Sequence, residues 1–374
     1  MSLGVPGKRL LIFGQEYPGT SGASVHSCEI FKQFLSEERA GGTFSPSLLV
    51  SKNNSGVGGR ISTYPFPGFV PKIVRPFFAG KFLKKAGCDV VHADFYNTGA
   101  AAGLAVGGKT PLVVTIHDVI PWFRNEYSKK GLIYYKFCFE IVQKKADAVL
   151  VVSKTSAKEA VEFAGIEKDR VFPVYNGINH EVFYPDANKG AVGSVFTISY
   201  CGGYGSRKNV DLLVGAAELL SSRRGSLFPG KTLRIALVGT LPKLLLEKIS
   251  NLGLSHVFRP LGFVSLPSLR KLYSNSDIFV FPSLAEGFGM PPLEAMACGC
   301  PVLSSNASCL PEILGNSAEY FDPLSAEDLA EKIISLENSP ARLKRLSCAG
   351  KEQAAKYSWA KTCKSLEKIY AKLL

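Results

Sequence analysis

The sequence predicts an α/β protein of two domains, each built on a parallel β-sheet. The chain has 374 residues, which is too long for one comfortable hydrophobic core. In both halves, short apolar runs typical of buried parallel strands are followed by Gly-containing loops and helical stretches. The pattern pauses at residues 180–194, where Pro and Gly accumulate, and then restarts. We therefore expect one domain at residues 1–185 and a second at 186–355.

Composition narrows the class of protein. A hydrophobic content of 46% excludes wholesale disorder. No apolar run approaches the roughly 18 residues that a bilayer-spanning helix needs, and residues 1–4 lack the apolar core of a signal peptide. The nine cysteines show no Cys-x-x-Cys spacing, which favours reduced thiols in a cytoplasmic protein and argues against a structural metal.

The formal net charge of +13 implies an anionic partner. The basic residues are not gathered into a tail or an aromatic-interleaved strip, so a nucleic-acid partner is not expected. Nucleotide-sugar diphosphates and acidic lipid surfaces remain. Residues 72–85 hold five basic and no acidic residues, and residues 124–145 carry net +4 (six basic, two acidic). Each stretch fits a solvated helix face or a surface that rests on an anionic membrane, where a basic residue contributes about 1 kcal/mol.

The first predicted strand-to-helix turn is a candidate phosphate site. A strand at residues 9–14 leads through a Gly-containing loop at 17–24 into a helix at about 25–35. Free N–H groups and the helix dipole would favour an anion at Gly22 and Ala23. The spacing is not G-x-G-x-x-G, and no acidic residue ends the strand at 48–50, so a dinucleotide-binding dehydrogenase is disfavoured. A purely structural turn is the alternative.

A His-Asp pair follows the predicted strand at residues 111–116. His117 and Asp118 would stand at the carboxyl end of that strand, where open α/β sheets bind ligands. Such a pair suits hydrogen bonds to hydroxyls and to a leaving phosphate. The alternative is that it only caps local backbone.

The second half offers two cations after a glycine-rich loop. A strand at residues 194–200 and the loop 202–209 feed a helix that begins near residue 210. Arg207 and Lys208 would place one bidentate and one point-charge cation where a pyrophosphate could sit. Gly203 in the same loop is a further candidate. A solvated surface pair is the alternative.

The stretch from Glu286 to Glu294 is the most informative part of the chain. A short apolar run at residues 277–281 predicts a buried strand, and Pro291 and Pro292 suit the first turn of a helix. Both carboxylates would therefore lie near a strand-end crevice. Sugar hydroxyls suit carboxylates, whereas phosphate does not. The alternative is a solvated Glu pair at an ordinary helix start.

Three blocks of the sequence together resemble the retaining family 4 glycosyltransferases of the GT-B fold. They are Glu286-x7-Glu294 with Gly-Phe-Gly between, Arg-Lys-Asn at 207–209, and Thr-Ile-His-Asp-Val-Ile-Pro at 115–121. The resemblance covers roughly residues 10–374. It implies two Rossmann-like domains facing across a cleft, with the predicted amphipathic helix at 356–374 packing back on the first domain.

The resemblance also implies roles for the candidate residues. His117 and Glu286 would be catalytic, with Asp118 a further candidate. The donor diphosphate would contact Gly22, Ala23, Arg207 and Lys208, and Gly203 is a further candidate there. The donor sugar would contact Gly287, Phe288 and Gly289, and the nucleoside would contact Val264 and Glu294.

The implied reaction is transfer of a sugar from a nucleoside-diphosphate sugar, with retention at the anomeric carbon. The residues of the 115–121 block look most like those of bacterial and archaeal enzymes of polysaccharide assembly, which are often mannosyltransferases. GDP-mannose is therefore the first expected donor, and UDP-glucose, UDP-N-acetylhexosamine and dTDP-rhamnose are the other candidates. No Asp-x-Asp motif occurs, so neither a metal nor another cofactor is expected. We expect the acceptor to be a glycan or a lipid-linked molecule. We expect the enzyme to be cytoplasmic and peripheral on the inner face of the membrane. A GT-B nucleotide-sugar epimerase and, less favoured, a basic nucleic-acid-binding protein are the alternatives.

Overall fold

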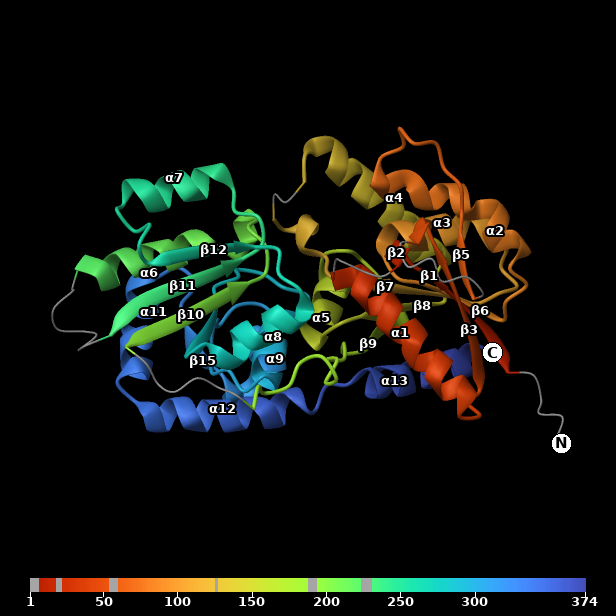
Figure 1. Ribbon diagram of the computed structural model, residues 1–374. Helices are drawn as coiled ribbons and strands as arrows, with labels where there is room; N and C mark the ends of the chain where they lie inside the picture. The colour runs from red at the N-terminus through yellow and green to blue at the C-terminus, as the bar shows by residue number, and fades with distance from the viewer. Residues whose placement is uncertain (1–6, 18–21, 54–59, 125–126, 188–193, 223–230) are drawn as a thin grey trace. The chain divides into compact units, whose positions relative to one another are not determined.

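The chain folds into two compact units. The computed structural model describes residues 7–17, 22–53, 60–124, 127–187, 194–222 and 231–374 (Figure 1). Unit 1 comprises Met1–Gly177 together with Trp359–Leu374, and unit 2 comprises Ile178–Ser358. The divisions at 177/178 and 358/359 lie eight and three residues from the boundaries expected at 185/186 and 355/356.

Unit 1 is built on a seven-stranded parallel sheet of order β5-β3-β1-β6-β7-β8-β9. Its central strands are buried on both faces, as continuous aliphatic runs such as Leu112–Ile116 predict. The strands are β1 (Lys8–Phe13), β3 (Phe44–Val50), β5 (Ile61–Thr63), β6 (Val90–Ala93), β7 (Leu112–Ile116), β8 (Ala148–Val151) and β9 (Val171–Pro173); β2 (Glu16–Tyr17) and β4 (Lys52–Asn53) form a separate short pair.

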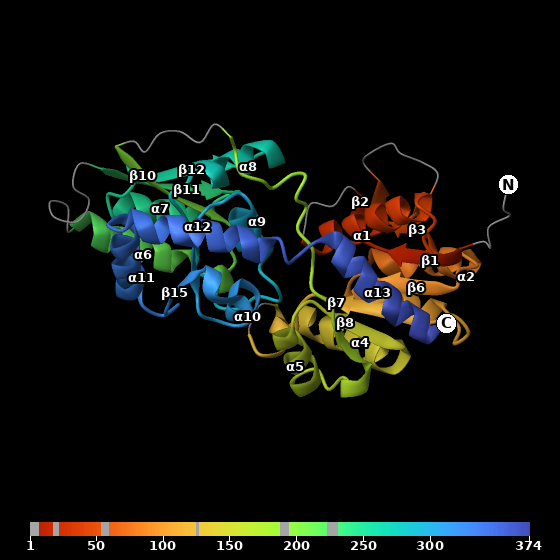
Figure 2. The same ribbon diagram turned by 90° about the horizontal axis from the view of Figure 1, so that it is seen from below.

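Helices cover both faces of this sheet (Figure 2). One face carries α1 (Gly22–Arg39) and α13 (Trp359–Leu373), which contact each other. The buried residues of α13 recur at helical spacing, so the helix presents one apolar stripe to unit 1. The remaining helical segments are η1 (Lys72–Ala79), α2 (Gly80–Lys85), α3 (Tyr96–Ala105), η2 (Ile120–Trp122), α4 (Lys129–Lys145), α5 (Lys154–Glu162) and η3 (Lys168–Arg170).

Unit 2 is built on a six-stranded parallel sheet of order β12-β11-β10-β13-β14-β15. The predicted α/β class with two parallel sheets is therefore confirmed. The strands are β10 (Val195–Cys201), β11 (Thr232–Val238), β12 (Phe258–Gly262), β13 (Ile278–Phe281), β14 (Val302–Ser305) and β15 (Glu319–Phe321). The helical segments are η4 (Ser206–Lys208), α6 (Val210–Ser222), α7 (Lys243–Asn251), α8 (Leu266–Asn275), α9 (Met290–Ala297), α10 (Leu310–Leu314), η5 (Gly315–Ser317), α11 (Ala326–Glu337) and α12 (Pro340–Ala354).

Each sheet has one topological switch point, and these two places position the functional groups. In unit 1 the chain runs from β1 outward to β5 and then returns to β6 on the other side of β1. In unit 2 it runs from β10 outward to β12 and returns to β13 on the other side of β10. Crevices at the carboxyl ends of such strand pairs are the usual ligand positions of open α/β sheets.

No helix within the described ranges is both long and apolar enough to cross a membrane.

Candidate active site

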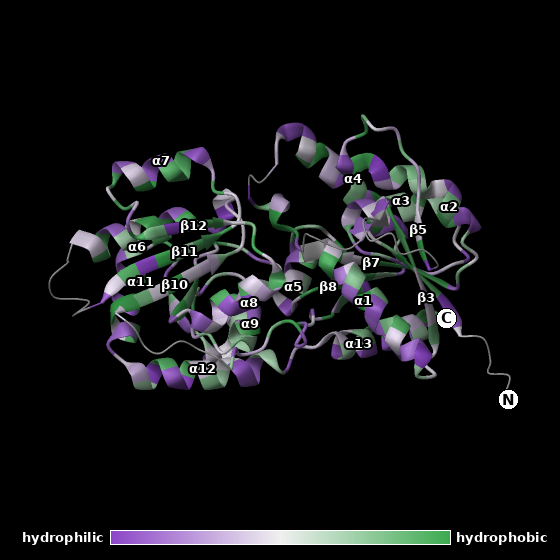
Figure 3. Cartoon of the chain, in the orientation of Figure 1, coloured by the Kyte–Doolittle hydropathy of each residue, from purple (hydrophilic) through white to green (hydrophobic). Residues whose placement is uncertain are grey.

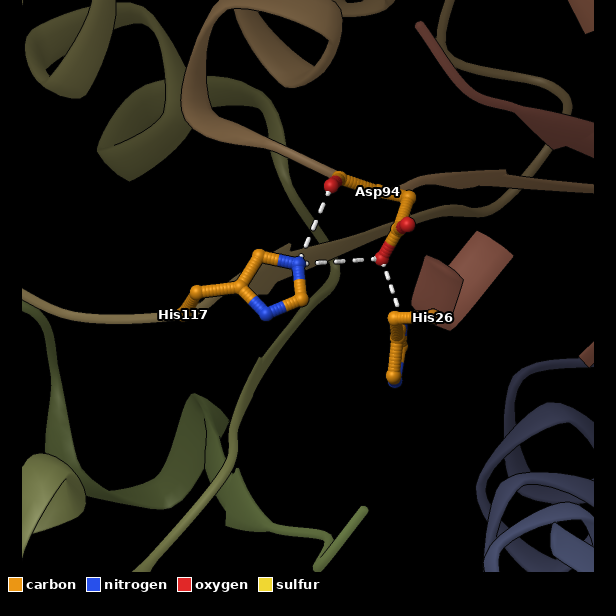
Figure 4. Close-up of side chains that lie close together, drawn as sticks. All are labelled: His26, Asp94 and His117. Carbon is orange, nitrogen blue, oxygen red and sulfur yellow. Dashed lines mark hydrogen bonds and ion pairs between the residues drawn. The ribbon is translucent and has the colours of Figure 1, made fainter. Parts of the chain in front are cut away.

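In unit 1 the candidate His117 lies directly after β7 and is tied to the residue that follows β6. His117 Nε2 is 3.3 Å from Asp94 Oδ1 and 3.3 Å from the Asp94 backbone oxygen (Figure 4). Asp94 is 2% exposed, whereas the His117 side chain is 15% exposed. The Asp94 carboxylate is therefore buried, and the His117 imidazole that contacts it is more accessible to solvent.

A second imidazole reaches the same carboxylate from α1. His26 Nδ1 hydrogen-bonds Asp94 Oδ1, and the His26 and His117 rings are perpendicular, with centroids 5.0 Å apart (Figure 4). The Trp359 ring lies 5.6 Å from the His26 ring, so α13 also packs against this group. We name Asp94, His26 and His117 the unit 1 triad.

The charges of the unit 1 triad are set by burial and by contact. Burial alone would raise the pKa of Asp94, but His26 and His117 hold it well below its usual range. Burial alone would lower the pKa of His117, but Asp94 outweighs it, and the pKa of His117 is raised. Nearby, burial lowers the pKa of His92 to about 3. His92 is therefore neutral at pH 7, and its two ring nitrogens contact Thr115 Oγ1 at 2.7 Å and the Tyr370 hydroxyl at 2.6 Å.

Within the described residues, the unit 1 triad is the one set of three His, Cys, Asp or Glu side chains whose ligand atoms all lie within 4.8 Å of one another. A cation could be considered for so compact a set. The close contacts are, however, all imidazole-to-carboxylate hydrogen bonds. We therefore describe the set as a hydrogen-bonded network.

Three other unit 1 candidates lie around the same strand ends. Gly22 and Ala23 are the first two residues of α1, but residues 18–21 of the predicted phosphate loop lie outside the described residues. Asp118 Oδ1 accepts a hydrogen bond from the backbone N–H of Ile120 at 3.2 Å. That contact is the local capping that was the alternative for this residue.

In unit 2 the structure brings Glu286, Arg207 and Lys208 together at the switch point. Glu286 is 7% exposed and follows β13. Arg207 Nη1 lies 3.0 Å from Glu286 Oε2, and Lys208 Nζ lies 2.6 Å from Oε1. Burial alone would raise the pKa of Glu286, but Lys208 and Arg207 lower it below its ordinary value. We name these three residues the unit 2 cluster; together their formal charges sum to +1.

The loop that carries the two cations is held by its next residue, Asn209. This residue has a left-handed backbone (φ 56°), where Asn is better tolerated than most side chains. Its side-chain amide donates to the carbonyls of Pro282 (3.1 Å) and Pro323 (2.8 Å). On the other side, Ser308 Oγ donates to the Glu286 carbonyl at 2.9 Å. Asn209 and Ser308 thus hold the backbone on both sides of the ion pairs.

The Gly-Phe-Gly turn gives its three residues different surroundings. Gly289 has φ 91°, and a Cβ there would lie 2.8 Å from Leu310 Cδ2, so a glycine is required on both grounds. The side chain of Phe288 is 4% exposed and packs edge-on against Tyr357 with centroids 5.6 Å apart. Its ring is therefore core, and only backbone atoms at 287–289 can serve the predicted sugar contacts.

Of the remaining unit 2 candidates, Glu294 lies on α9, and Gly203 and Val264 follow the ends of β10 and β12. Glu294 is half-buried on α9 and accepts from the Tyr273 hydroxyl at 3.4 Å; burial raises the pKa of Glu294 to about 7. Val264 is half-buried and precedes the helix cap Ser265. Gly203 has φ 80°, and its carbonyl accepts a hydrogen bond from the Tyr200 hydroxyl.

Sequence reasoning missed two members of the unit 1 triad and two residues that hold the backbone around the unit 2 cluster. Asp94, His26, Asn209 and Ser308 all contact a predicted site residue or its loop. Asp94 carried a usable signal, because it directly follows the apolar strand at 90–93. Asn209 belongs to the Arg-Lys-Asn block, which marked it without showing its role, and His26 and Ser308 carried no signal because their partners lie in distant parts of the chain.

The chain matches two protein-family models that lie end to end. Residues 35–182 match the model described as Glycosyltransferase Family 4, and residues 187–353 match Glycosyl transferases group 1. Among curated proteins, it is 30% identical over 301 residues to serotype-specific mannosyltransferase WbdA of Escherichia coli, which covers 76% of this chain and 36% of WbdA. The chain spans about a third of the length of the first such relatives. It is 27% identical to the uncharacterized glycosyltransferase MJ1178 of Methanocaldococcus jannaschii, over 80% of each chain.

Solved structures share the fold. Sucrose-phosphate synthase from Thermosynechococcus elongatus superimposes with a TM-score of 0.81 at 17% identity, covering 98% of this chain and 99% of that one. At this identity the likeness concerns the fold alone, and the predicted GT-B fold is confirmed.

Replacing Glu294 with Gln should make stability less sensitive to pH. Its pKa of about 7 in the folded protein lies above the ordinary 4.5. A carboxyl whose pKa is raised by folding favours the folded state most below pH 4.5, and this contribution is lost as the pH rises toward 7. Between pH 5 and pH 8 the parent protein should lose about 1–3 kcal/mol more unfolding free energy than Glu294→Gln, measured by urea denaturation. Parallel pH curves for the two proteins would contradict the assignment.

Proposed function

Because the chain belongs to the family 4 glycosyltransferases, we propose that it transfers a sugar from a nucleoside-diphosphate sugar to a glycan or lipid-linked acceptor, with retention at the anomeric carbon. The observation that carries this proposal is the unit 2 cluster: a buried carboxylate held by two cations at the switch point of the sheet. Few substrates need both a hydrogen-bond acceptor for their hydroxyl groups and a net positive charge beside it. A sugar joined to a diphosphate needs both.

The cations of the unit 2 cluster suit the leaving diphosphate. Arg207 and Lys208 supply two positive charges, and Glu286 offsets one of them. The net charge favours an anion, and it is fixed in place before the anion arrives. Such preorganised charge stabilises negative charge as it develops on a leaving group. The glycosidic bond to the diphosphate would therefore break without a metal.

Glu286 suits the transferred sugar. Its pKa is lowered, so it is a carboxylate at neutral pH and accepts hydrogen bonds from sugar hydroxyls. No protein nucleophile is needed in the account that the family implies: the departing phosphate takes the proton of the acceptor hydroxyl while the sugar is held. The resemblance also assigns His117 a contact with the sugar and its phosphate.

The nucleoside would rest on other parts of unit 2. Glu294 would accept hydrogen bonds from the ribose hydroxyls, and backbone near Val264 would meet the base. A base held by backbone leaves no side-chain signature of its identity. Mannose from GDP-mannose is our first choice of donor, because the relative WbdA is named a mannosyltransferase.

A panel of nucleotide sugars tests the proposal. We expect turnover of one donor, GDP-mannose first, that depends on a glycan or lipid-linked acceptor, with retained configuration by NMR of the product. An inverted product would overturn the retaining assignment. Release of a free epimer without acceptor would identify the epimerase alternative, and steep salt-dependent binding of DNA or RNA would identify a nucleic-acid-binding protein.

Removing both cations should weaken donor binding. Arg207→Ala with Lys208→Ala deletes two charge-assisted contacts to the diphosphate, so the Kd for GDP, measured by calorimetry, should rise about 100-fold. Lys243→Ala with Lys271→Ala removes the same charge from exposed helix positions of unit 2 and is the matched control. Equal GDP affinity in the two double variants would refute the diphosphate role. The same pair of variants is repeated with UDP.

We further propose that unit 1 rests on an anionic membrane through η1, α2 and α4. Large apolar side chains are exposed there beside lysines, and the ribbon of α4 in Figure 3 carries both hydrophilic and hydrophobic colours. Exposed apolar side chains between basic ones suit the headgroup region of a bilayer. The exposed apolar residues are Ile73, Phe78, Phe82, Ile133 and Phe137; the exposed lysines are Lys72, Lys81, Lys84, Lys85, Lys129, Lys130 and Lys136.

Charge reversal on α2 should release the protein from vesicles. Lys81→Glu, Lys84→Glu and Lys85→Glu together remove three attractive contributions of about 1 kcal/mol each, so flotation with phosphatidylglycerol vesicles should fall at least 10-fold. The control reverses three exposed lysines of α13, Lys364, Lys368 and Lys372, which lie in the same unit. The membrane proposal would be contradicted if the parent protein floated equally well with neutral phosphatidylcholine vesicles. It would also be contradicted if the α13 control lost as much flotation as the α2 variant.

A further inference from the structure

The unit 1 triad assigns the ring nitrogens of both histidines. Carboxylate oxygens only accept hydrogen bonds. Asp94 Oδ1 faces Nδ1 of His26 and Nε2 of His117, so both of these nitrogens carry a proton. The backbone oxygen of Asp94 also accepts from His117 Nε2. The plane and the tautomer of His117 are therefore fixed by one residue, through two acceptors.

The three residues differ in access to solvent. His26 and Asp94 are each 2% exposed, while the His117 side chain is 15% exposed. Nδ1 of His117 lies on the side of the ring turned away from Asp94 (Figure 4). A ligand at the strand ends would therefore meet His117 and not the two residues behind it.

We propose that Asp94 and His26 are positioning residues that hold His117 as an imidazolium, so that His117 presents Nδ1–H to the anionic donor. This inference rests on the proposed function, in that it takes His117 as the group which meets the donor. Asp94 fixes Nε2 and supplies the counter-charge. His26 fixes the carboxylate from the opposite side. In this arrangement His117 donates a charged hydrogen bond and does not act as a base.

The surroundings leave Asp94 as the carboxylate that governs His117. The titratable groups that face His117 are His26 on α1, His92 and Asp94 on and after β6, and Asp118 after β7, with Tyr370 of α13 behind His92. His92 is neutral, and Asp118 also raises the pKa of His117 but by less than Asp94, which contacts the ring directly.

The other oxygen of Asp94 supports this assignment. Asp94 Oδ2 is buried and has no hydrogen-bond partner among the described residues. The charge of the carboxylate is therefore offset mainly by the two imidazoles on Oδ1. The raised pKa of His117 agrees with this placement of charge.

The first test is independent of activity. The chain has five histidines, and Gln variants of the exposed His180 and His256 simplify their assignment in long-range ¹⁵N–¹H spectra. We expect His117 to stay doubly protonated above pH 6.5, with Nε2 protonated when it does titrate. In Asp94→Asn its midpoint should fall below that value. A His117 that is neutral with its proton on Nδ1, or that titrates equally in Asp94→Asn, would overturn the inference.

The second test is kinetic and uses the donor that the panel selects. Asp94→Asn should lower kcat about 100-fold with a nearly unchanged donor KM, and should move the alkaline limb of the kcat profile to lower pH. His26→Ala should lower kcat about 10-fold, and His26→Asn, whose amide can replace Nδ1–H, should recover most of it. Tyr370→Phe removes only the hydroxyl that contacts His92 and should leave kcat unchanged.

Two results would contradict positioning. The first is an Asp94→Asn enzyme that is less stable but keeps its alkaline limb. The second is equal loss in His26→Ala and His26→Asn. If the parent protein turns over no donor of the panel, the proposed function fails, and the NMR titration alone decides the geometry of the unit 1 triad.

Discussion

The buried carboxylate of Glu286 is the constraint on which unit 2 depends. Removing one charge from water costs several kcal/mol, and the cost is recovered only with close, well-placed partners. Arg207 and Lys208 supply them from the end of β10, while Glu286 stands at the end of β13. The two loops must therefore keep a separation at which these ion pairs can form. Asn209 ties its loop to the carbonyls of Pro282 and Pro323, and Ser308 holds the backbone carbonyl of Glu286.

Unit 1 also contains a buried carboxylate that is balanced by close partners, but these partners differ in how far they are exposed to solvent. The carboxylate of Asp94 is buried and the groups that balance it are imidazoles, one enclosed and one accessible. Both groups sit where a strand order reverses, so the backbone around them diverges and leaves room for side chains to converge. In unit 2 the accessible partners are permanent cations. In unit 1 the accessible partner is a group whose charge depends on its neighbour.

Local patterns in the sequence were enough for the elements, for the three residues of the unit 2 cluster and for one residue, His117, of the unit 1 triad. Apolar runs gave the strands, and Pro291 and Gly299 mark the limits of α9 as predicted. Glu286, Arg207 and Lys208 are each predicted to bind part of the same donor, but their ion pairs are not predicted; these join residues 79 and 78 positions apart, which no local pattern encodes. His26 and Asp94 are 68 positions apart. The burial of the Phe288 ring could not be predicted, since a loop aromatic gives no sign of whether it faces a ligand or the core. The basic window at 124–145 divided between Tyr135 and Phe139 inside and Ile133 and Phe137 outside, which helical periodicity decides only once the core face is known.

The chain passes from unit 1 into unit 2 at residues 177/178 and returns at 358/359, so unit 2 is an insertion within unit 1. The returning helix α13 brings Trp359 against His26 and Tyr370 against His92. During synthesis, unit 2 has all of its residues before unit 1 does. His26 and His92 therefore lack their contacts with Trp359 and Tyr370 until after every residue of unit 2 has been synthesised.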